Sequence, residues 1–86
     1  MDAIDAVLFL GLKYKSLTIS LSDACAEIGI RPSTGANQLS AGAFPIPTSK
    51  VGGKRVVDIR DLALYIDERR EKARQEWEAS RLQIEC

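Results

Sequence analysis

Apolar side chains near the start of the chain recur at helical spacing. The stripe consists of Ile4, Val7, Leu8, Gly11 and Leu12. Phe9 and Leu10 place further apolar groups on other sides of such a helix. We therefore expect a helix over residues 1–16 that is buried on several faces, although the unbroken apolar run from Val7 to Leu10 also fits a short strand.

Two short helices joined by a tight turn are predicted next. Ser20, followed three residues later by Asp23, is typical of a capping box, so a helix begins directly after it. Gly29 supplies the positive φ that ends this helix. Pro32 suits the first turn of the following helix, because its missing N–H is not needed there, and that helix runs over residues 32–41.

The second of these helices has a polar outer face. Ala36 and Leu39 are expected to face inward, which leaves the polar side chains on the opposite face. These side chains are Thr34, Asn37 and Gln38, with Ser33 beside them. Gly35 lies within the same helix and costs about 1 kcal/mol relative to Ala. A short or irregular helix is therefore predicted.

A basic β-hairpin follows an extended, proline-containing segment. Two prolines keep residues 44–47 out of a helix. The segment 50–57 then fits two short strands around Gly52 and Gly53, a dipeptide typical of a two-residue hairpin turn. Basic residues flank the tip of this hairpin.

A long helix is predicted for the C-terminal part of the chain, over residues 58–82. Asp58 and Asp61 repeat the capping pattern at its start. Its first half is apolar enough to pack on the domain, whereas its second half offers only Ala73 and Trp77 among many charges. Those two residues are expected to contact a second copy of the chain, and the alternative for Trp77 is that it covers the core of its own subunit.

The charge is unevenly distributed, although the formal net charge is zero. Residues 30–60 contain five basic side chains and one acidic one, a local excess of four positive charges, and the flanking segments are acidic. Such an excess favours a polyanionic partner, although local fluctuation in a neutral chain is the alternative. The polar helix face has a similar alternative, an ordinary solvated surface.

Catalysis finds no support in the residue types present. The chain has no His, no metal-ligand spacing, no phosphate-binding loop and no nucleophile with a nearby base. Cys25 and Cys86 do not form a disulfide framework, and Cys25 fits a buried small apolar side chain. We expect a protein that is not an enzyme, has no metal or cofactor, does not enter a membrane and lies in the cytoplasm, associated with the bacterial nucleoid.

These elements in this order predict one domain, residues 1–86, mainly α-helical with a small β-hairpin: a winged helix-turn-helix. Residues 1–16 form its N-terminal helix, residues 20–57 the helix-turn-helix and wing, and residues 58–82 its C-terminal helix. In such domains the second helix enters the major groove, where amides and hydroxyls read base edges. The expected base-reading residues are Ser33, Thr34, Asn37 and Gln38. The expected phosphate contacts are Arg31, Lys50, Lys54, Arg55 and Arg60.

Several motifs between Ser20 and Ile66 resemble the excisionase and MerR-type winged domains. They are Ala24-Cys25 to Gly29-Ile30, Gly42-Ala43-Phe44-Pro45, Val51-Gly52-Gly53-Lys54-Arg55 and Asp61-Leu62 to Tyr65-Ile66. A closer resemblance, to the pyocin activator protein family, is carried by Phe44-Pro45-Ile46-Pro47, the basic hairpin, Asp61-Leu62-Ala63 with Tyr65-Ile66-Asp67, and Arg69-Arg70. This resemblance implies a phage- or tailocin-associated activator that binds promoter DNA.

The predicted function is therefore a sequence-specific regulator of transcription that binds double-stranded DNA as a homodimer or higher multimer and contacts RNA polymerase. Two alternatives remain open at this point. An excisionase-like architectural factor would bend DNA without touching polymerase, and a protein-binding adaptor would use the same scaffold to hold a protein partner.

Overall fold

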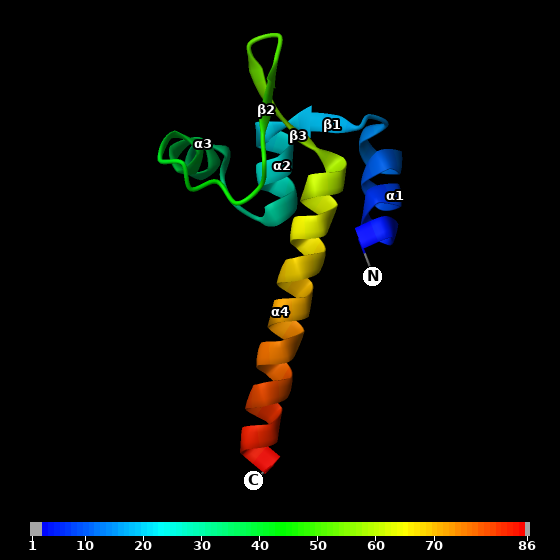
Figure 1. Ribbon diagram of the computed structural model, residues 1–86, viewed down its shortest axis with the longest axis vertical. Coiled ribbons are helices and arrows are strands. Elements are labelled where there is room, and N and C mark those ends of the chain that lie inside the picture. Colours follow the sequence, from blue (N-terminus) through cyan, green and yellow to red (C-terminus); the bar gives the residue numbers. More distant parts are fainter. Residues whose placement is uncertain (1–2, 86) are drawn as a thin grey trace.

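Four helices and three strands make up residues 3–85, the part of the chain that this computed structural model describes (Figure 1). In chain order they are α1 (Ala3–Tyr14), β1 (Thr18–Ser20), α2 (Leu21–Ile28), α3 (Pro32–Ser40), β2 (Ser49–Val51), β3 (Lys54–Asp58) and α4 (Ile59–Glu85). The result is a mainly helical small domain with a three-stranded antiparallel sheet and a long C-terminal helix. This arrangement is compatible with a winged-helix fold.

The burial of α1 differs from the expectation. Ala6 and Leu10 are buried in the core, on the side of the helix that packs against α4. The opposite side exposes four large apolar side chains, those of Ile4, Leu8, Phe9 and Leu12. The prediction of burial on several faces is therefore wrong, because α4 and the end of α2 cover only one side of this helix.

Polar contacts tie the C-terminal end of α1 to α2. The Tyr14 hydroxyl donates a hydrogen bond of 2.5 Å to Oε1 of Glu27, and the Lys13 ammonium forms an ion pair with the same carboxylate. Burial alone would raise the pKa of Glu27, but the two donors outweigh it and hold this pKa below its ordinary value. The helix stops short of the predicted residue 16, because Lys15 adopts a positive φ of 54°.

The sheet has one strand more than the predicted hairpin. Its order is β1-β3-β2, with both neighbouring pairs antiparallel. Ile19 of β1 pairs with Val57 of β3, and both side chains are buried. The hairpin itself is confirmed: Gly52 and Gly53 have φ values of 58° and 79°, the positive angles that a type I′ turn requires.

The two helices of the predicted helix-turn-helix are confirmed, including their local signals. The Ser20 hydroxyl accepts a hydrogen bond of 3.1 Å from the backbone N–H of Asp23, as a capping residue should. Gly29 ends α2 in the left-handed region with φ 82°. Pro32 occupies the start of α3, whose helical residues end at Ser40 rather than at residue 41.

Helix α4 begins in the core and then leaves it. Ile59, Leu62 and Ala63 are buried, whereas every residue from Glu68 to Arg81 is exposed. The second half of the helix therefore projects away from the domain, which accounts for the overall dimensions of 56 × 30 × 16 Å (Figure 1). Among the described residues, this and the other helices lack a stretch of the length and apolar character needed to span a bilayer.

Candidate functional site

The exposed surface of α3 differs in two positions from the predicted one. Ser33, Thr34 and Asn37 are exposed, as expected, but Ala36 is exposed too instead of facing the core. Gln38 is half-buried, and its Oε1 atom is enclosed without a hydrogen-bond partner among the described residues. The exposed face is therefore rotated about the helix axis relative to the predicted one, and Gln38 lies at its edge.

Gly35 explains this rotation, because it is the residue of α3 that faces α2. A Cβ atom at Gly35 would lie 2.2 Å from Sγ of Cys25, far inside van der Waals contact. Cys25 is completely buried, and burial raises the pKa of its thiol. The helix is regular across Gly35, so the expected irregularity is not present: this glycine permits α2 and α3 to pack closely.

The N-terminus of α3 is unlike those of the two neighbouring helices. Helix α2 begins with the Ser20 cap and has Asp23 in its first turn. At the start of α4, Asp58 accepts a 2.8 Å hydrogen bond from the backbone N–H of Arg60. By contrast, Arg31, the residue directly before α3, makes no side-chain capping hydrogen bond, and the first turn of α3 has no acidic residue. Its positive end is therefore not neutralised by a carboxylate of its own first turn.

Three of the predicted phosphate-contacting residues gather on the hairpin. Lys50 lies directly opposite Arg55, and Lys54 is the next residue along β3, opposite Val51. All are exposed. Within residues 3–85 no carboxylate pairs with them, and the Arg55 guanidinium has only a hydrogen bond of 3.4 Å to the Thr48 hydroxyl. Like charges that face each other across two strands repel, so this hairpin carries an electrostatic cost in the isolated chain.

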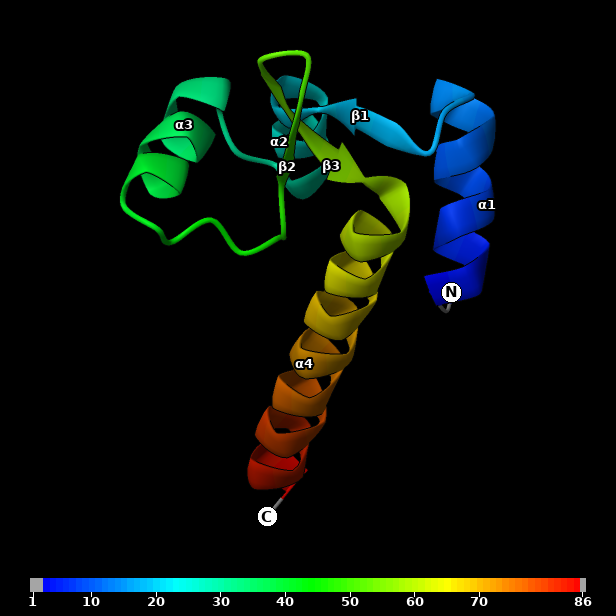
Figure 2. The same cartoon turned by 45° about the horizontal axis from the view of Figure 1, so that its top comes forward.

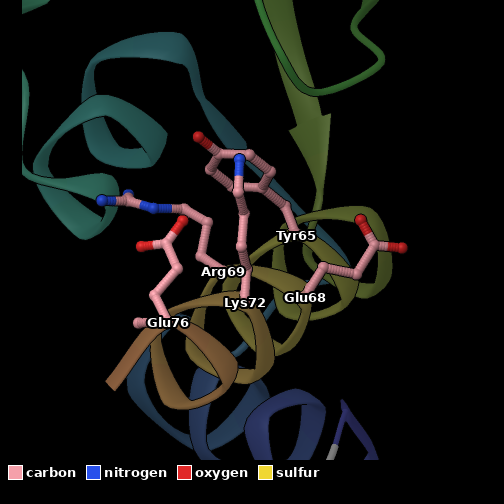
Figure 3. A pocket seen from close by; sticks show the side chains of 6 residues that line it. Tyr65, Glu68, Arg69, Lys72 and Glu76 are labelled. Atoms are coloured by element: carbon pink, nitrogen blue, oxygen red, sulfur yellow. The ribbon is translucent and has the colours of Figure 1, made fainter. Parts of the chain in front are cut away.

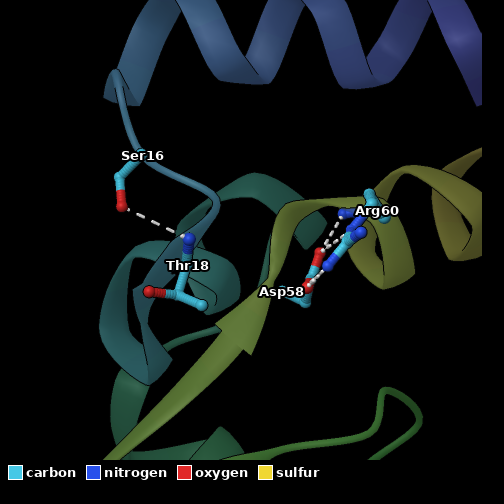
Figure 4. A network of polar contacts seen from close by, with 4 residues as sticks. All are labelled: Ser16, Thr18, Asp58 and Arg60. Atoms are coloured by element: carbon cyan, nitrogen blue, oxygen red, sulfur yellow. Dashed lines mark hydrogen bonds and ion pairs between the residues drawn. The ribbon is translucent and has the colours of Figure 1, made fainter.

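Arg60 is arranged differently, as Figure 4 shows. Its guanidinium makes two hydrogen bonds to the carboxylate of Asp58, of 2.9 and 2.6 Å. The hydrogen bond from Arg60 is the main cause that holds the pKa of Asp58 below its ordinary value. The pair stands where β3 passes into α4, near Thr18, whose backbone N–H is bonded to the Ser16 hydroxyl (Figure 4). Arg60 therefore differs from Lys50, Lys54 and Arg55, because its positive charge is already paired with the Asp58 carboxylate.

Helix α3 and the tip of the hairpin lie at the same end of the molecule. In Figures 1 and 2 both are found away from the C-terminal end of α4, and α1 lies on the other side of α2. In both views the hairpin rises over α2 with α3 to its left, and the extended segment after α3 leads into β2. Ile46 anchors that segment in the core. Helix α3 and the basic hairpin therefore both lie at the end of the molecule away from the C-terminal end of α4.

A shallow hollow of about 550 Å³ lies along α4 (Figure 3). Its lining combines two basic and two acidic side chains with Tyr65 and Ala73. The Arg69 guanidinium reaches from here to α2, where it donates a hydrogen bond of 3.1 Å to the carbonyl oxygen of Ile28. Arg69 also stacks near the Tyr65 ring, 5.5 Å from its centroid. These contacts fasten α4 to the end of α2, a structural role that the sequence pattern did not indicate.

The two residues expected at a dimer contact are separated from the core. Ala73 lines the hollow on α4, and Trp77 is 58% exposed with the Arg81 guanidinium over its ring. The alternative that Trp77 covers the core of its own subunit is therefore wrong. Whether Trp77 contacts a second copy stays a prediction.

Metal chemistry has no evident location in the described part of the chain, where no three His, Cys, Asp or Glu side chains lie close enough to hold an ion together. Comparison with known proteins gives no match, since no family model fits the sequence and no curated protein or solved structure is significantly similar to it.

Proposed function

We propose that this chain is a winged helix-turn-helix protein that binds double-stranded DNA in a sequence-specific manner and regulates transcription. In this proposal α3 enters the major groove and the β2–β3 hairpin is the wing that contacts the phosphate backbone. The resemblance to the pyocin activators favours an activator that binds promoter DNA beside RNA polymerase.

The observation that carries the proposal is the concentration of unpaired positive charge on the hairpin. Lys50 faces Arg55 directly, Lys54 adjoins them, and no carboxylate of the described residues pairs with any of the three. Elsewhere on the molecule, Lys13 and Arg60 are paired with carboxylates. A bound polyanion relieves the repulsion within the hairpin, because its phosphates offset the positive charges, and the phosphate contacts also release condensed counterions.

Helix α3 supplies the residues for base recognition. Asn37 is exposed, and its carboxamide can form a bidentate pair with adenine, while the Ser33 and Thr34 hydroxyls can serve as donors or acceptors. The uncapped start of α3, with Arg31 beside it, adds a second position for a backbone phosphate. Gln38 makes a weaker contribution than Asn37 in this proposal, because its carboxamide oxygen is enclosed.

The test is selection of bound sites from a random duplex pool, followed by titration of the selected site and of random duplex with variants. We expect Asn37→Ala to weaken binding to the selected site by roughly 1–3 kcal/mol while leaving random duplex nearly unchanged. Lys54→Ala should weaken both alike. Equal losses at both sites for Asn37→Ala would refute the base-reading role, and failure to enrich any sequence would refute sequence-specific recognition.

Further measurements distinguish a transcription regulator from an architectural DNA-bending factor and from a protein-binding adaptor. A promoter reporter that responds to the chain without a measurable bend in the bound duplex supports regulation through polymerase. A sharp bend without a reporter response indicates an architectural factor instead. Binding to duplex DNA that is weak and insensitive to salt would indicate a protein-binding adaptor.

A further inference from the structure

The outer face of α1 is an apolar surface that nothing in the described chain covers. It consists of Ile4, Leu8, Phe9 and Leu12, which are 72, 62, 58 and 79% exposed. Ile4, Leu8 and Leu12 succeed one another at intervals of four residues, so they form one continuous ridge on the helix, with Phe9 beside it. This outer face is opposite to the side that contributes Ala6 and Leu10 to the core.

The size of this surface fits an interface rather than incidental exposure. Four large apolar side chains that are each more than half exposed offer an area on the order of 500 Å². A standard interface buries about 800 Å² on each partner, of which the apolar centre is a part and the polar rim the remainder. Single exposed apolar residues need no explanation, but a contiguous ridge of this area does.

We propose that α1 is a homodimerisation helix, and that its outer face packs against the same face of a second copy in an antiparallel arrangement. Ridges formed by residues four apart interdigitate with each other, so the face is complementary to itself. A twofold axis near Leu8 brings Ile4 of one chain toward Leu12 of the other. The same patch is then used on both subunits, as a closed dimer requires.

Charge at the ends of α1 decides between the two possible directions. Asp5 lies near the beginning of the helix, whereas Lys15 directly follows its last residue, Tyr14. Lys13 is held by Glu27 of its own chain, so the cation available to the partner at this end is Lys15. An antiparallel pair brings Asp5 of each chain to the end of the partner's helix that carries Lys15. A parallel pair would instead bring Asp5 next to its own copy, which is unfavourable.

The location of α1 allows a dimer to form while the other exposed elements stay accessible to a ligand. In both views α1 lies on the side of α2 that is opposite to α3 (Figures 1 and 2). A dimer formed through α1 therefore leaves α3, the hairpin and the projecting part of α4 uncovered. This inference goes beyond the proposed DNA binding and does not depend on it.

Sedimentation equilibrium of the full chain without DNA tests the interface. We expect the unmodified chain to be a dimer, Leu8→Glu and Leu12→Glu to be monomers, and Val51→Glu, the control at an exposed apolar residue of the hairpin, to remain a dimer. Both α1 substitutions are on exposed positions, so far-ultraviolet circular dichroism should show unchanged helix content. A monomeric unmodified chain, or dimers that persist in both α1 variants, would overturn the proposal.

Charge exchange tests the direction. Asp5→Lys and Lys15→Glu should each weaken dimerisation by about two- to fivefold at low ionic strength, the range measured for exposed ion pairs. The double variant should recover most of that loss, because it restores opposite charges at each end of the pair. Single variants without effect, or a double variant weaker than either single one, would overturn the antiparallel arrangement.

Discussion

Helices α1 and α3 lie on opposite sides of α2, and each turns one face to the core and one face to solvent. The solvent face of α3 carries Ser33, Thr34 and Asn37. The solvent face of α1 carries an apolar ridge that includes Leu8 and Leu12. Each helix therefore packs one face in the core and exposes the other. The exposed face of α3 is polar, whereas the exposed face of α1 is apolar.

The chemistry of each exposed face determines which kind of partner it can bind. A hydroxyl and amide surface is well solvated in the free chain, so it gains from a ligand only through specific hydrogen bonds. An apolar ridge gains simply from leaving water, about 25 cal/mol for each Å² that is covered. The α3 side is thus suited to recognition of a polar, charged ligand, and the α1 side to contact with another apolar surface.

The largest change in the free energy of unfolding is expected for a substitution on the buried face of α1, compared with one on its exposed face. Leu10→Ala should lower the free energy of unfolding by about 3 kcal/mol, because Leu10 is almost completely buried and its truncation leaves a cavity. Leu12→Ala should change it by less than about 0.5 kcal/mol at concentrations where the chain is monomeric. Urea unfolding of both variants measures this, and equal losses would show that the two faces are not distinct.

The packing of α3 on α2 gives the next effect. Gly35→Ala should destabilise the chain by about 2 kcal/mol, in spite of the better helix propensity of Ala, because the new Cβ collides with Sγ of Cys25. Combination with Cys25→Ala should remove most of that penalty, since the colliding atom is gone. A Gly35→Ala penalty that is unchanged in the Cys25→Ala background would contradict this account of the close approach.

Substitution of single basic residues should have a smaller effect on DNA binding. The effect should differ between Lys54, which has no carboxylate partner among the described residues, and Arg60, which is paired with Asp58. Lys54→Ala should reduce affinity for random duplex several-fold and lower the slope of log K against log salt by roughly 0.9. Arg60→Ala should change the slope by less than half of that, because its guanidinium is held by Asp58. Fluorescence anisotropy over a salt series measures both slopes, and equal changes would contradict the distinction.

The smallest effect concerns the polar link between α1 and α2. Glu27→Gln should cost about 0.5 to 1 kcal/mol at pH 7, because the carboxylate accepts from Tyr14 and Lys13. The pKa of Glu27 is lowered in the folded chain, so its contribution is complete above its unfolded pKa, near 4.3, and is lost as the pH falls through the folded value. The difference in free energy of unfolding between the unmodified chain and Glu27→Gln should therefore decrease below about pH 4. A difference that does not change with pH would contradict this role of Glu27.

Local signals predicted most of the element boundaries. The Ser20 cap, Pro32 at the start of α3 and the Gly52-Gly53 turn act within a few residues, so sequence alone was sufficient to recognise them. Strand β1 was missed as a strand, because three residues form it and its pairing with β3 joins segments far apart in the chain.

The remaining differences depend on tertiary contacts that no local pattern contains. The exposure of Leu8 and Leu12 follows from which side of α1 meets α4. The orientation of α3 follows from the meeting of Gly35 and Cys25. The pairing of Arg60 was readable in principle, since Asp58 is two residues away, but sequence did not show which cations would be left without a partner.

We propose that the α3 and hairpin side of the molecule contacts duplex DNA while the α1 side does not. Backbone amide chemical shifts, recorded as a selected duplex is added at near-physiological salt, test this proposal. We expect the changes to concentrate in residues 31–38 and 50–55 and to leave residues 4–12 unaffected. Changes confined to α1 or to the projecting part of α4, or no changes at all, would contradict the account.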